Sequence, residues 1–224
     1  MHVVVINHNQ QEFVKPMLDA LATISPLFVF DRCEPIEGCR HIVNSEGEGF
    51  LAGRMRDLGA DRVDDDILFI DGDKVPQGDI VADINRLREK YDCICYGVSG
   101  SLETSPYREF MRVDGADGLL SKSNGGVQLI FGCYSCGMWI SKNAVAGLRR
   151  LNGGRIFHPA FDGYWGDEDN FVGDELNHLG LRVGYSTHVR LAGGLGGLTA
   201  KNADDFGRNF VTRIKLNKTI LGMR

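Results

Sequence analysis

Short runs of β-branched and aromatic residues alternate with segments of helical period in the first half of the chain, and this alternation limits the folds it can adopt. The strand-like runs are VVVIN (3–7), PLFVF (26–30), DILFI (66–70) and CICYGVS (93–99). Helix-period segments lie between them, at residues 11–23, 49–58 and 79–90. Continuous apolar runs are typical of strands buried on both faces of a parallel sheet that helices cover on each side. The sequence therefore predicts a three-layer α/β/α domain.

The pattern changes after residue 100, where strand-like runs follow one another without a helix between them. These runs are REFMRV (108–113) and VQLIFGCYSCGMWI (127–140). Later elements are helices over residues 141–151, 168–180 and 203–221, the first capped by Ser141, and a strand over residues 182–187. We expect a mainly parallel, partly mixed central sheet in a single domain over residues 1–224, because no linker or shift in composition divides the chain.

The composition is that of a globular protein with a sizeable core, since 43% of the 224 residues are hydrophobic. The 25 basic and 30 acidic side chains give a formal net charge of −5, which argues against a surface devoted to nucleic acid or anionic lipid. No basic leader opens the sequence, and no apolar run approaches the ~20 residues of a membrane helix. We expect a cytoplasmic protein with no transmembrane segment.

The cysteines allow two interpretations. Cys93 and Cys95, together with Cys133 and Cys136, supply four thiolates, the number that a structural zinc site needs. Both pairs lie in strand-like apolar segments, however, where alternate residues face opposite sides of a sheet. Buried free thiols are therefore the favoured interpretation, and a zinc site is the alternative.

Two aspartates follow a buried strand in the segment FIDGDKV. Asp71 and Asp73 are expected just past the carboxyl end of that strand, where open α/β sheets place their ligand crevice. Carboxylate oxygens suit Mg²⁺ or Mn²⁺, which complete their coordination with water and a substrate diphosphate. The alternative is an ordinary Asp-Gly turn.

Three consecutive carboxylates stand in YWGDEDN, at Asp167, Glu168 and Asp169. Their repulsion is offset if they open a helix, because the free N–H groups and the helix dipole stabilise negative charge there. On a helical count Asp169 shares a stripe with apolar residues and so faces the protein body, where a carboxylate can act as a general base. The alternative is that the three acids only cap the helix.

The segment GEGFLAGRMRDLGADRVDDDILFIDGDKVP resembles the stretch of GT-A fold nucleotide-sugar glycosyltransferases that runs from an Arg-Asn-x-Gly helix end to the metal-binding Asp-x-Asp. Arg56 and Gly59 match that helix end, and Asp57 stands in place of the asparagine. VVINHN and FVFDRCEP resemble the first two strands of the family. The resemblance implies a GT-A-like (Rossmann-like) fold, a donor site that includes Arg56 and Asp71, and a uracil pocket lined by Asn7, Asn9 and Asp31.

The segment YWGDEDNFVGDELNHLGLRVGY is similar to the acceptor-side motif of these enzymes, including the large inverting family 2 and the Glu-Asp-motif galactosyl and N-acetylgalactosaminyl transferases. By this resemblance Asp169 is the general base of an inverting reaction and Glu168 orients the acceptor, although retaining members carry a similar Glu-Asp run. Tyr164 and Trp165 would either stack on the acceptor sugar or pack in the protein core. Asp167 would contact the acceptor. His188 is the candidate third metal ligand.

These expectations together describe a metal-dependent glycosyltransferase that uses Mn²⁺ or Mg²⁺. Residues 1–99 would bind a nucleoside diphosphate sugar, expected to be a UDP-sugar, and residues 100–224 a hydroxyl acceptor: a glycan, a lipid-linked sugar, a protein or a modified nucleobase. One rival is a GT-A-like module that binds a nucleotide sugar or glycan without catalysis. Another is a sugar nucleotidyltransferase, which INHNQQEF disfavours because it lacks a glycine after the first strand.

Two further segments bear on the acceptor. The glycine-rich loop around residues 193–197 is either a lid over bound donor or a loop that orders only with ligand. The tail carries five basic residues that either contact a polyanionic acceptor or membrane or, as we favour, form a solvated helix face. These are Arg208, Arg213, Lys215, Lys218 and Arg224.

Overall fold

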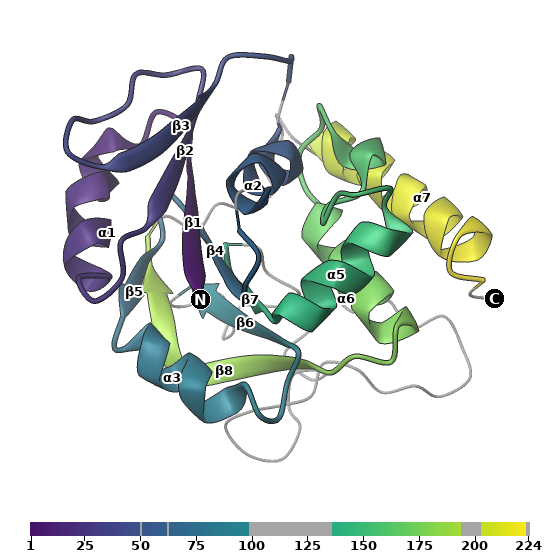
Figure 1. Ribbon diagram of the computed structural model, residues 1–224. Helices are drawn as coiled ribbons and strands as arrows, with labels where there is room; N and C mark the ends of the chain where they lie inside the picture. The colour runs from purple at the N-terminus through teal and green to yellow at the C-terminus, as the bar shows by residue number, and fades with distance from the viewer. Residues whose placement is uncertain (50, 62, 99–135, 194–202, 223–224) are drawn as a thin grey trace.

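The computed structural model describes residues 1–49, 51–61, 63–98, 136–193 and 203–222 (Figure 1). Within these residues, eight strands form one sheet in the order β3-β2-β1-β4-β7-β6-β8-β5. The strands are β1 (His2–Asn7), β2 (Leu27–Asp31), β3 (Arg40–Asn44), β4 (Ile67–Asp71), β5 (Val75–Gln77), β6 (Cys93–Val98), β7 (Gly137–Ile140) and β8 (Val183–Ala192).

The first four strands in spatial order are parallel, as β3 pairs with β2, β2 with β1 and β1 with β4. β7 lies antiparallel between β4 and β6. β8 runs parallel to β6, and β5 closes the other edge antiparallel to β8. The sheet is thus mainly parallel and partly mixed, which confirms the prediction from sequence.

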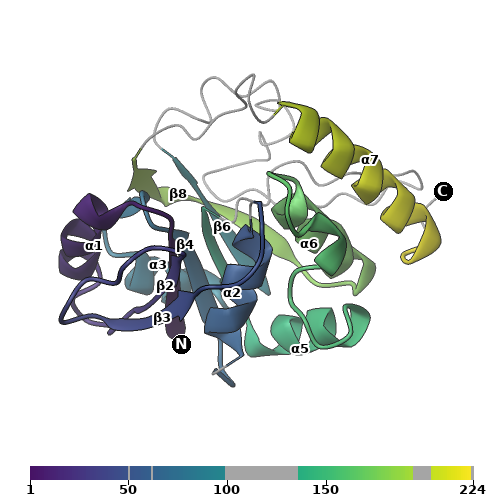
Figure 2. The ribbon, with the colours of Figure 1, turned by 90° about the horizontal axis from the view of Figure 1, so that it is seen from above.

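Helices cover both faces of the sheet. α2 (Ala52–Ala60), α5 (Lys142–Leu151) and α6 (Glu168–His178) pack with Val4, Val29 and Phe69 in one hydrophobic core. α1 (Val14–Ala20) and α3 (Ile80–Leu87) pack on the opposite face in a second core. Figure 2 shows α2, α5 and α6 on one side of the sheet and α1 on the other. The three-layer α/β/α prediction is therefore confirmed.

Outside these layers, α7 (Ala203–Thr219) lies against α6, with a small core that includes Phe161 and Phe171 beneath it (Figure 2). Two 3₁₀ turns complete the described elements, η1 (Gln11–Phe13) before α1 and η2 (Pro159–Phe161) before α6. α7 therefore packs on α6 and on the segment that precedes it.

Local chemistry explains two of these placements. Ser141 caps α5, because its Oγ accepts a hydrogen bond of 3.2 Å from the Ala144 N–H, as predicted from sequence. α2 lies close to β1 at Gly59, where an added Cβ would stand 2.3 Å from Cγ1 of Val4. The glycine thus sets how near the helix comes to the sheet.

The structure also contains elements that the sequence pattern did not predict. β3 is an edge strand with four of its five residues exposed or half-buried, so it lacks an apolar run. β5 has only three residues, one of them a proline. The helix predicted over residues 11–23 is a 3₁₀ turn followed by a shorter α1, and β8 extends five residues beyond residue 187. Phe50 and the strands predicted at 108–113 and in 127–135 lie outside the described residues.

Among the described residues, Cys33, Cys39, Cys93, Cys95 and Cys136 are free cysteines. Cys93 and Cys95 are fully buried in β6, which agrees with core thiols. Cys133 lies outside the described residues. None of the helices in the described part of the chain is both long and apolar enough to pass through a bilayer.

Candidate active site at the carboxyl ends of the strands

Three neighbouring strands end at one edge of the sheet with a polar residue. β1 ends at Asn7, β2 at Asp31 and β4 at Asp71. The register places Asn7 beside Phe30 and Asp71 beside Ile6, so the three strand ends lie next to one another. This is the edge where open α/β sheets bind ligands. The fold therefore brings together the predicted donor residues that follow these strands.

Arg56 of α2 connects this edge to the acidic helix start. Its guanidinium donates to Asp71 Oδ1 at 2.7 Å and to Glu168 Oε1 at 3.0 Å. Only 2% of the Arg56 side chain is exposed, and its Cζ lies 5.4 Å from the centre of the Phe157 ring. Burial lowers the pKa of Arg56, but the charges of Asp71 and Glu168 outweigh it and raise that pKa overall. Three separate sequence motifs thus meet at one fixed cation.

Glu168 and Asp169 are the first two residues of α6. Burial raises the pKa of Glu168 to about 7, with a further contribution from the negative charge of Asp169 and an opposing one from Arg56. Asp169 is half-buried, and its Oδ1 accepts a hydrogen bond of 2.8 Å from the Asn170 N–H. Two adjacent carboxylates therefore occupy different environments, one enclosed beside Arg56 and the other closer to solvent.

The two aspartates after β4 fit a divalent cation by their donor chemistry and their access. The side chains are 28% exposed at Asp71 and 22% exposed at Asp73, so both are accessible from solvent. Mg²⁺ and Mn²⁺ are often held by one or two carboxylates together with substrate phosphates. Each aspartate also has an internal cation, Arg56 for Asp71 and Lys74 for Asp73.

His188 does not join these two aspartates. It is exposed on β8, and its N–H donates to Ser186 Oγ at 3.2 Å. In the part of the chain that the structure describes, no group of three or more His, Cys, Asp or Glu side chains is placed to hold a metal ion. The expected three-residue metal set is therefore reduced to Asp71 and Asp73, because the length of β8 carries His188 away from the strand ends.

The predicted base-binding residues lie at the ends of β1 and β2. Asn7 is buried and closes a turn with Gln10, whose N–H donates to Asn7 Oδ1 at 3.0 Å. Asn9 follows in this turn with a left-handed backbone, φ 57°. This turn places Asn9, with His8 before it, just beyond the strand end.

Asp31 is buried and its carboxylate has three side-chain partners. Arg32 donates to both oxygens, Asn44 Nδ2 lies 2.9 Å from Oδ1, and His8 Nδ1 lies 3.0 Å from Oδ2. Burial raises the pKa of Asp31, but the hydrogen bonds from Arg32 and Asn44 outweigh it and lower that pKa overall. The sequence did not indicate His8, Arg32 or Asn44 as site residues. They join the site only because each contacts Asp31 in the folded protein.

The aromatic residues before α6 pack against α7. The Arg208 guanidinium lies 3.4 Å from the centre of the Tyr164 ring, and Trp165 contacts Phe206 with ring centres 6.2 Å apart. Both aromatic side chains remain half-buried. The two rings therefore lie beside the start of α6, as expected from their place in the sequence, but α7 covers part of each ring.

Asp167 is buried in the protein and is not accessible to an acceptor. It is buried with a left-handed backbone, φ 69°, and accepts hydrogen bonds from Arg213 Nη1 at 3.1 Å and Asn170 Nδ2 at 2.8 Å. Burial raises its pKa to about 6. The expectation that Asp167 contacts the acceptor is not retained, because its carboxylate faces α7.

Asp57 of α2 forms an ion pair with Arg155. Its carboxylate accepts hydrogen bonds from Arg155 Nε at 2.7 Å and from the Ile156 N–H at 2.8 Å. Burial raises the pKa of Asp57 to about 6, with the Arg155 contact acting in the opposite direction. Asp57, the residue after Arg56, therefore ties α2 to the segment between α5 and α6.

Cys136 is a site neighbour that the sequence did not indicate. Its carbonyl accepts a hydrogen bond of 3.1 Å from the Asp71 N–H. Burial, and then the charges of Asp71 and Asp169, raise the pKa of the Cys136 thiol well above its ordinary value. The Cys136 side chain therefore stays uncharged beside these acids.

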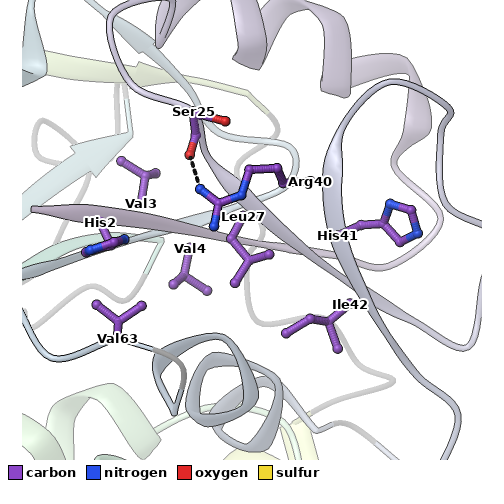
Figure 3. Close-up of a pocket in the computed structure, with 9 residues that line it drawn as sticks. All are labelled: His2, Val3, Val4, Ser25, Leu27, Arg40, His41, Ile42 and Val63. Carbon is purple, nitrogen blue, oxygen red and sulfur yellow. Dashed lines mark hydrogen bonds between the residues drawn. The ribbon is translucent and has the colours of Figure 1, made fainter.

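A separate cavity of about 330 Å³ lies at the amino ends of the parallel strands (Figure 3). His2, Leu27 and Arg40 line it, at the starts of β1, β2 and β3. Arg40 is exposed and donates to the Ser25 carbonyl at 3.5 Å. This cavity is thus distinct from the candidate active site, which lies where the same strands end.

No protein-family model matches the sequence, and no curated protein matches it. Among solved structures, GalNAc-T7 with UDP, GalNAc and Mn²⁺ is similar at a TM-score of 0.60 and 11% identity, over 99% of this chain and 48% of that one. The chain thus spans about half the length of that structure. A glucose-1-phosphate thymidylyltransferase structure from Bacillus anthracis, described as putative in function, has a TM-score of 0.49 and 11% identity, over 98% of this chain and 96% of that one. The likeness to GalNAc-T7 shows that the chain has a GT-A-like fold.

Proposed function

We propose that this protein is a metal-dependent glycosyltransferase that moves a sugar from a nucleoside diphosphate sugar, with UDP as the expected nucleotide, to an acceptor hydroxyl. The observation that carries the proposal is the Arg56 bridge, which joins Asp71 at the strand end to Glu168 at the start of α6. Arg56 thus holds the proposed donor site, at the end of β4, next to the proposed acceptor site, at the start of α6. This arrangement suits a transfer between two substrates. The complex of GalNAc-T7 with UDP and Mn²⁺ supports the same assignment by fold.

On the donor side, Asp71 and Asp73 would hold Mn²⁺ or Mg²⁺. A bound divalent cation would neutralise the charge that develops on the departing diphosphate. Asn7, Asn9 and Asp31 would contact the base at the ends of β1 and β2. Arg56 would keep Asp71 in place, since its second hydrogen bond fixes the guanidinium to α6.

On the acceptor side, Asp169 would take the proton of the attacking hydroxyl. The hydroxyl oxygen forms the new bond to the anomeric carbon as the bond from that carbon to the diphosphate oxygen breaks, which inverts the configuration. Glu168, with its pKa raised to about 7, would be partly protonated at neutral pH and could donate a hydrogen bond to the acceptor. Tyr164 and Trp165 would border the acceptor through the ring faces that α7 leaves uncovered.

The test is UDP release from a panel of UDP-sugars, with Mn²⁺ and with a chelator. We expect one donor to release UDP with Mn²⁺ only, and Asp73→Asn to abolish that release. Asp169→Asn should keep UDP binding and lose transfer to the acceptor, because it removes the base but no donor contact. Asp204→Asn, at an exposed position of α7, is the matched control and should behave as wild type.

The outcomes separate the alternatives. Failure of every nucleotide to bind, with or without metal, would refute the proposal. Metal-dependent nucleotide binding without turnover of any donor would instead support a non-catalytic binding module. Release of diphosphate from a nucleoside triphosphate and a sugar phosphate would indicate a nucleotidyltransferase.

A further inference from the structure

We propose that Lys74 is a built-in counter-cation of the donor site, which pairs with Asp73 in the metal-free protein and contacts the donor diphosphate once a divalent cation occupies Asp73. This inference rests on the proposed function. It concerns a residue that the metal and base motifs do not include. Lys74 would thereby become a donor-binding residue whose availability depends on the metal.

The Lys74 ammonium is held inside the site. Its Nζ lies 2.5 Å from Asp73 Oδ2, and only 5% of the side chain is exposed. The Lys74 N–H donates to the Asp71 carbonyl at 3.0 Å, which fixes the turn between β4 and β5. The lysine is therefore anchored by its backbone next to both predicted metal ligands, and its charge cannot simply move into water.

Gly193, at the end of β8, leaves room for this arrangement. A Cβ at Gly193 would stand 1.9 Å from the Asp73 carbonyl oxygen and 3.2 Å from Lys74 Cδ. The chain at position 193 thus packs directly over the turn that carries Asp73 and the lysine stem. A side chain there would push against the position that holds the ammonium.

The ammonium also lies among the other charged groups of the site. The charges of Asp71, Asp169, Lys74 and Arg56 all act on the thiol of Cys136. Lys74 is therefore part of the same charge cluster as the proposed metal ligands and base. Arg56 has two carboxylate partners, whereas Lys74 forms an ion pair only with Asp73 within the described residues.

A buried ammonium needs an anionic partner, because desolvation without one is costly. A divalent cation that binds Asp73 competes with Lys74 for the same carboxylate. The donor diphosphate brings new anionic oxygens to the same place, and the three N–H donors of an ammonium can bind them. The diphosphate therefore supplies the partner that the metal takes away.

The test measures binding, so it needs no acceptor and no turnover. Lys74→Met removes the ammonium and keeps an apolar stem, and Lys142→Met removes the same charge from an exposed pair with Asp64. Free Mn²⁺ is followed by electron paramagnetic resonance without nucleotide, and UDP binding by calorimetry at saturating Mn²⁺ and without metal. For Lys74→Met we expect Mn²⁺ alone to bind about tenfold tighter and UDP at saturating Mn²⁺ to bind about tenfold weaker, in line with charges a few ångströms apart near a protein surface. Lys142→Met should change neither.

A second variant tests the reverse side of the competition. Asp73→Asn removes the carboxylate that holds Lys74, so it should weaken Mn²⁺ binding while UDP alone binds as tightly as to wild type, or tighter. Lys74→Arg keeps the charge and should keep UDP binding at saturating Mn²⁺. These two variants carry the test if Lys74→Met does not fold.

The opposite signs distinguish this inference from a structural role for Lys74. If Lys74→Met weakens both ligands in parallel or leaves UDP binding at saturating Mn²⁺ unchanged, or if Asp73→Asn weakens metal-free UDP binding, the inference is wrong while the proposed function stands. If wild type binds neither Mn²⁺ nor UDP, the proposed function itself fails and this inference fails with it.

Discussion

Replacement of Glu175 by glutamine should stabilise this protein at neutral and alkaline pH. Glu175 is fully buried in α6, and its Oε2 accepts a hydrogen bond of 3.1 Å from Asn152 Nδ2. Among the described residues, Glu175 Oε1 and Asn152 Oδ1 have no hydrogen-bond partner. Burial raises the pKa of Glu175 to about 8, and the charges of Asp174 and Asp57 add to this while the Asn152 contact opposes it. The site thus favours an uncharged side chain.

The sign and size of the effect follow from the shifted pKa. The folded protein holds the Glu175 proton up to about pH 8, whereas the unfolded chain releases it near the ordinary value of 4.5. Its contribution to stability is fully present below pH 4.5 and is lost as pH rises through 8. At pH 7 the cost is about 3 kcal/mol, from about 1.4 kcal/mol per pH unit. A neutral glutamine removes this cost and can donate to Asn152 Oδ1.

Urea unfolding from pH 5 to pH 8 checks the prediction. The gain in unfolding free energy of Glu175→Gln over wild type should be small at pH 5 and grow to about 3 kcal/mol at pH 7. Glu37→Gln, the same change at an exposed residue, is the control and should follow wild type. A difference between Glu175→Gln and wild type that stays constant across this range would refute the reasoning, because a pH-independent effect cannot come from a proton.

Three further substitutions test the packing. Gly59→Ala should cost about 1–3 kcal/mol in urea unfolding, because its Cβ would overlap Val4; an unchanged midpoint would mean that α2 can shift at no cost. Ser141→Ala should lower the unfolding free energy by about 1 kcal/mol through loss of the α5 cap, and no loss in thermal unfolding would contradict the cap. Arg213→Met should cost about 3–5 kcal/mol, since it leaves Asp174 buried without its cation, and a loss below 1 kcal/mol would show that water replaces the arginine.

The strand ends could be predicted from sequence because they depend on local patterns. Asn7, Asp31 and Asp71 each follow an apolar run, and parallel strands place such ends at one edge. The partners of these residues could not be predicted in the same way. Arg56 meets Glu168 across 112 positions of sequence, and Arg155 meets Asp57 across 98. Such pairs depend on how the layers pack, which residue spacing does not record.

In the carboxyl-terminal helix α7, too, the side-chain partners could not be predicted from sequence. The tail was expected to present a solvated basic face, and this is wrong for Arg213, which is buried with both carboxylate oxygens of Asp174 on its guanidinium. Asn209 and Asn217, one turn before and one turn after it, are buried as well. A polar stripe on a helix indicates solvent unless its partners are known, and here the partners lie on α6 and in the segment just before it. Lys215 and Lys218 are exposed, in agreement with the expectation, whereas Arg224 lies outside the described residues, as do residues 194–202 of the glycine-rich loop.

The three consecutive acids in YWGDEDN can coexist because the fold separates their environments. Asp167 pairs with Arg213 of α7, and Glu168 pairs with Arg56 of α2, so two cations from distant parts of the chain hold the two buried acids. Asp169 is less buried than either and lies in the first turn of α6, where helix N–H groups favour negative charge. Repulsion within the run is therefore offset by cations from two different helices, α2 and α7. The arrangement leaves the acid nearest to solvent as the one that the proposed reaction uses as its base.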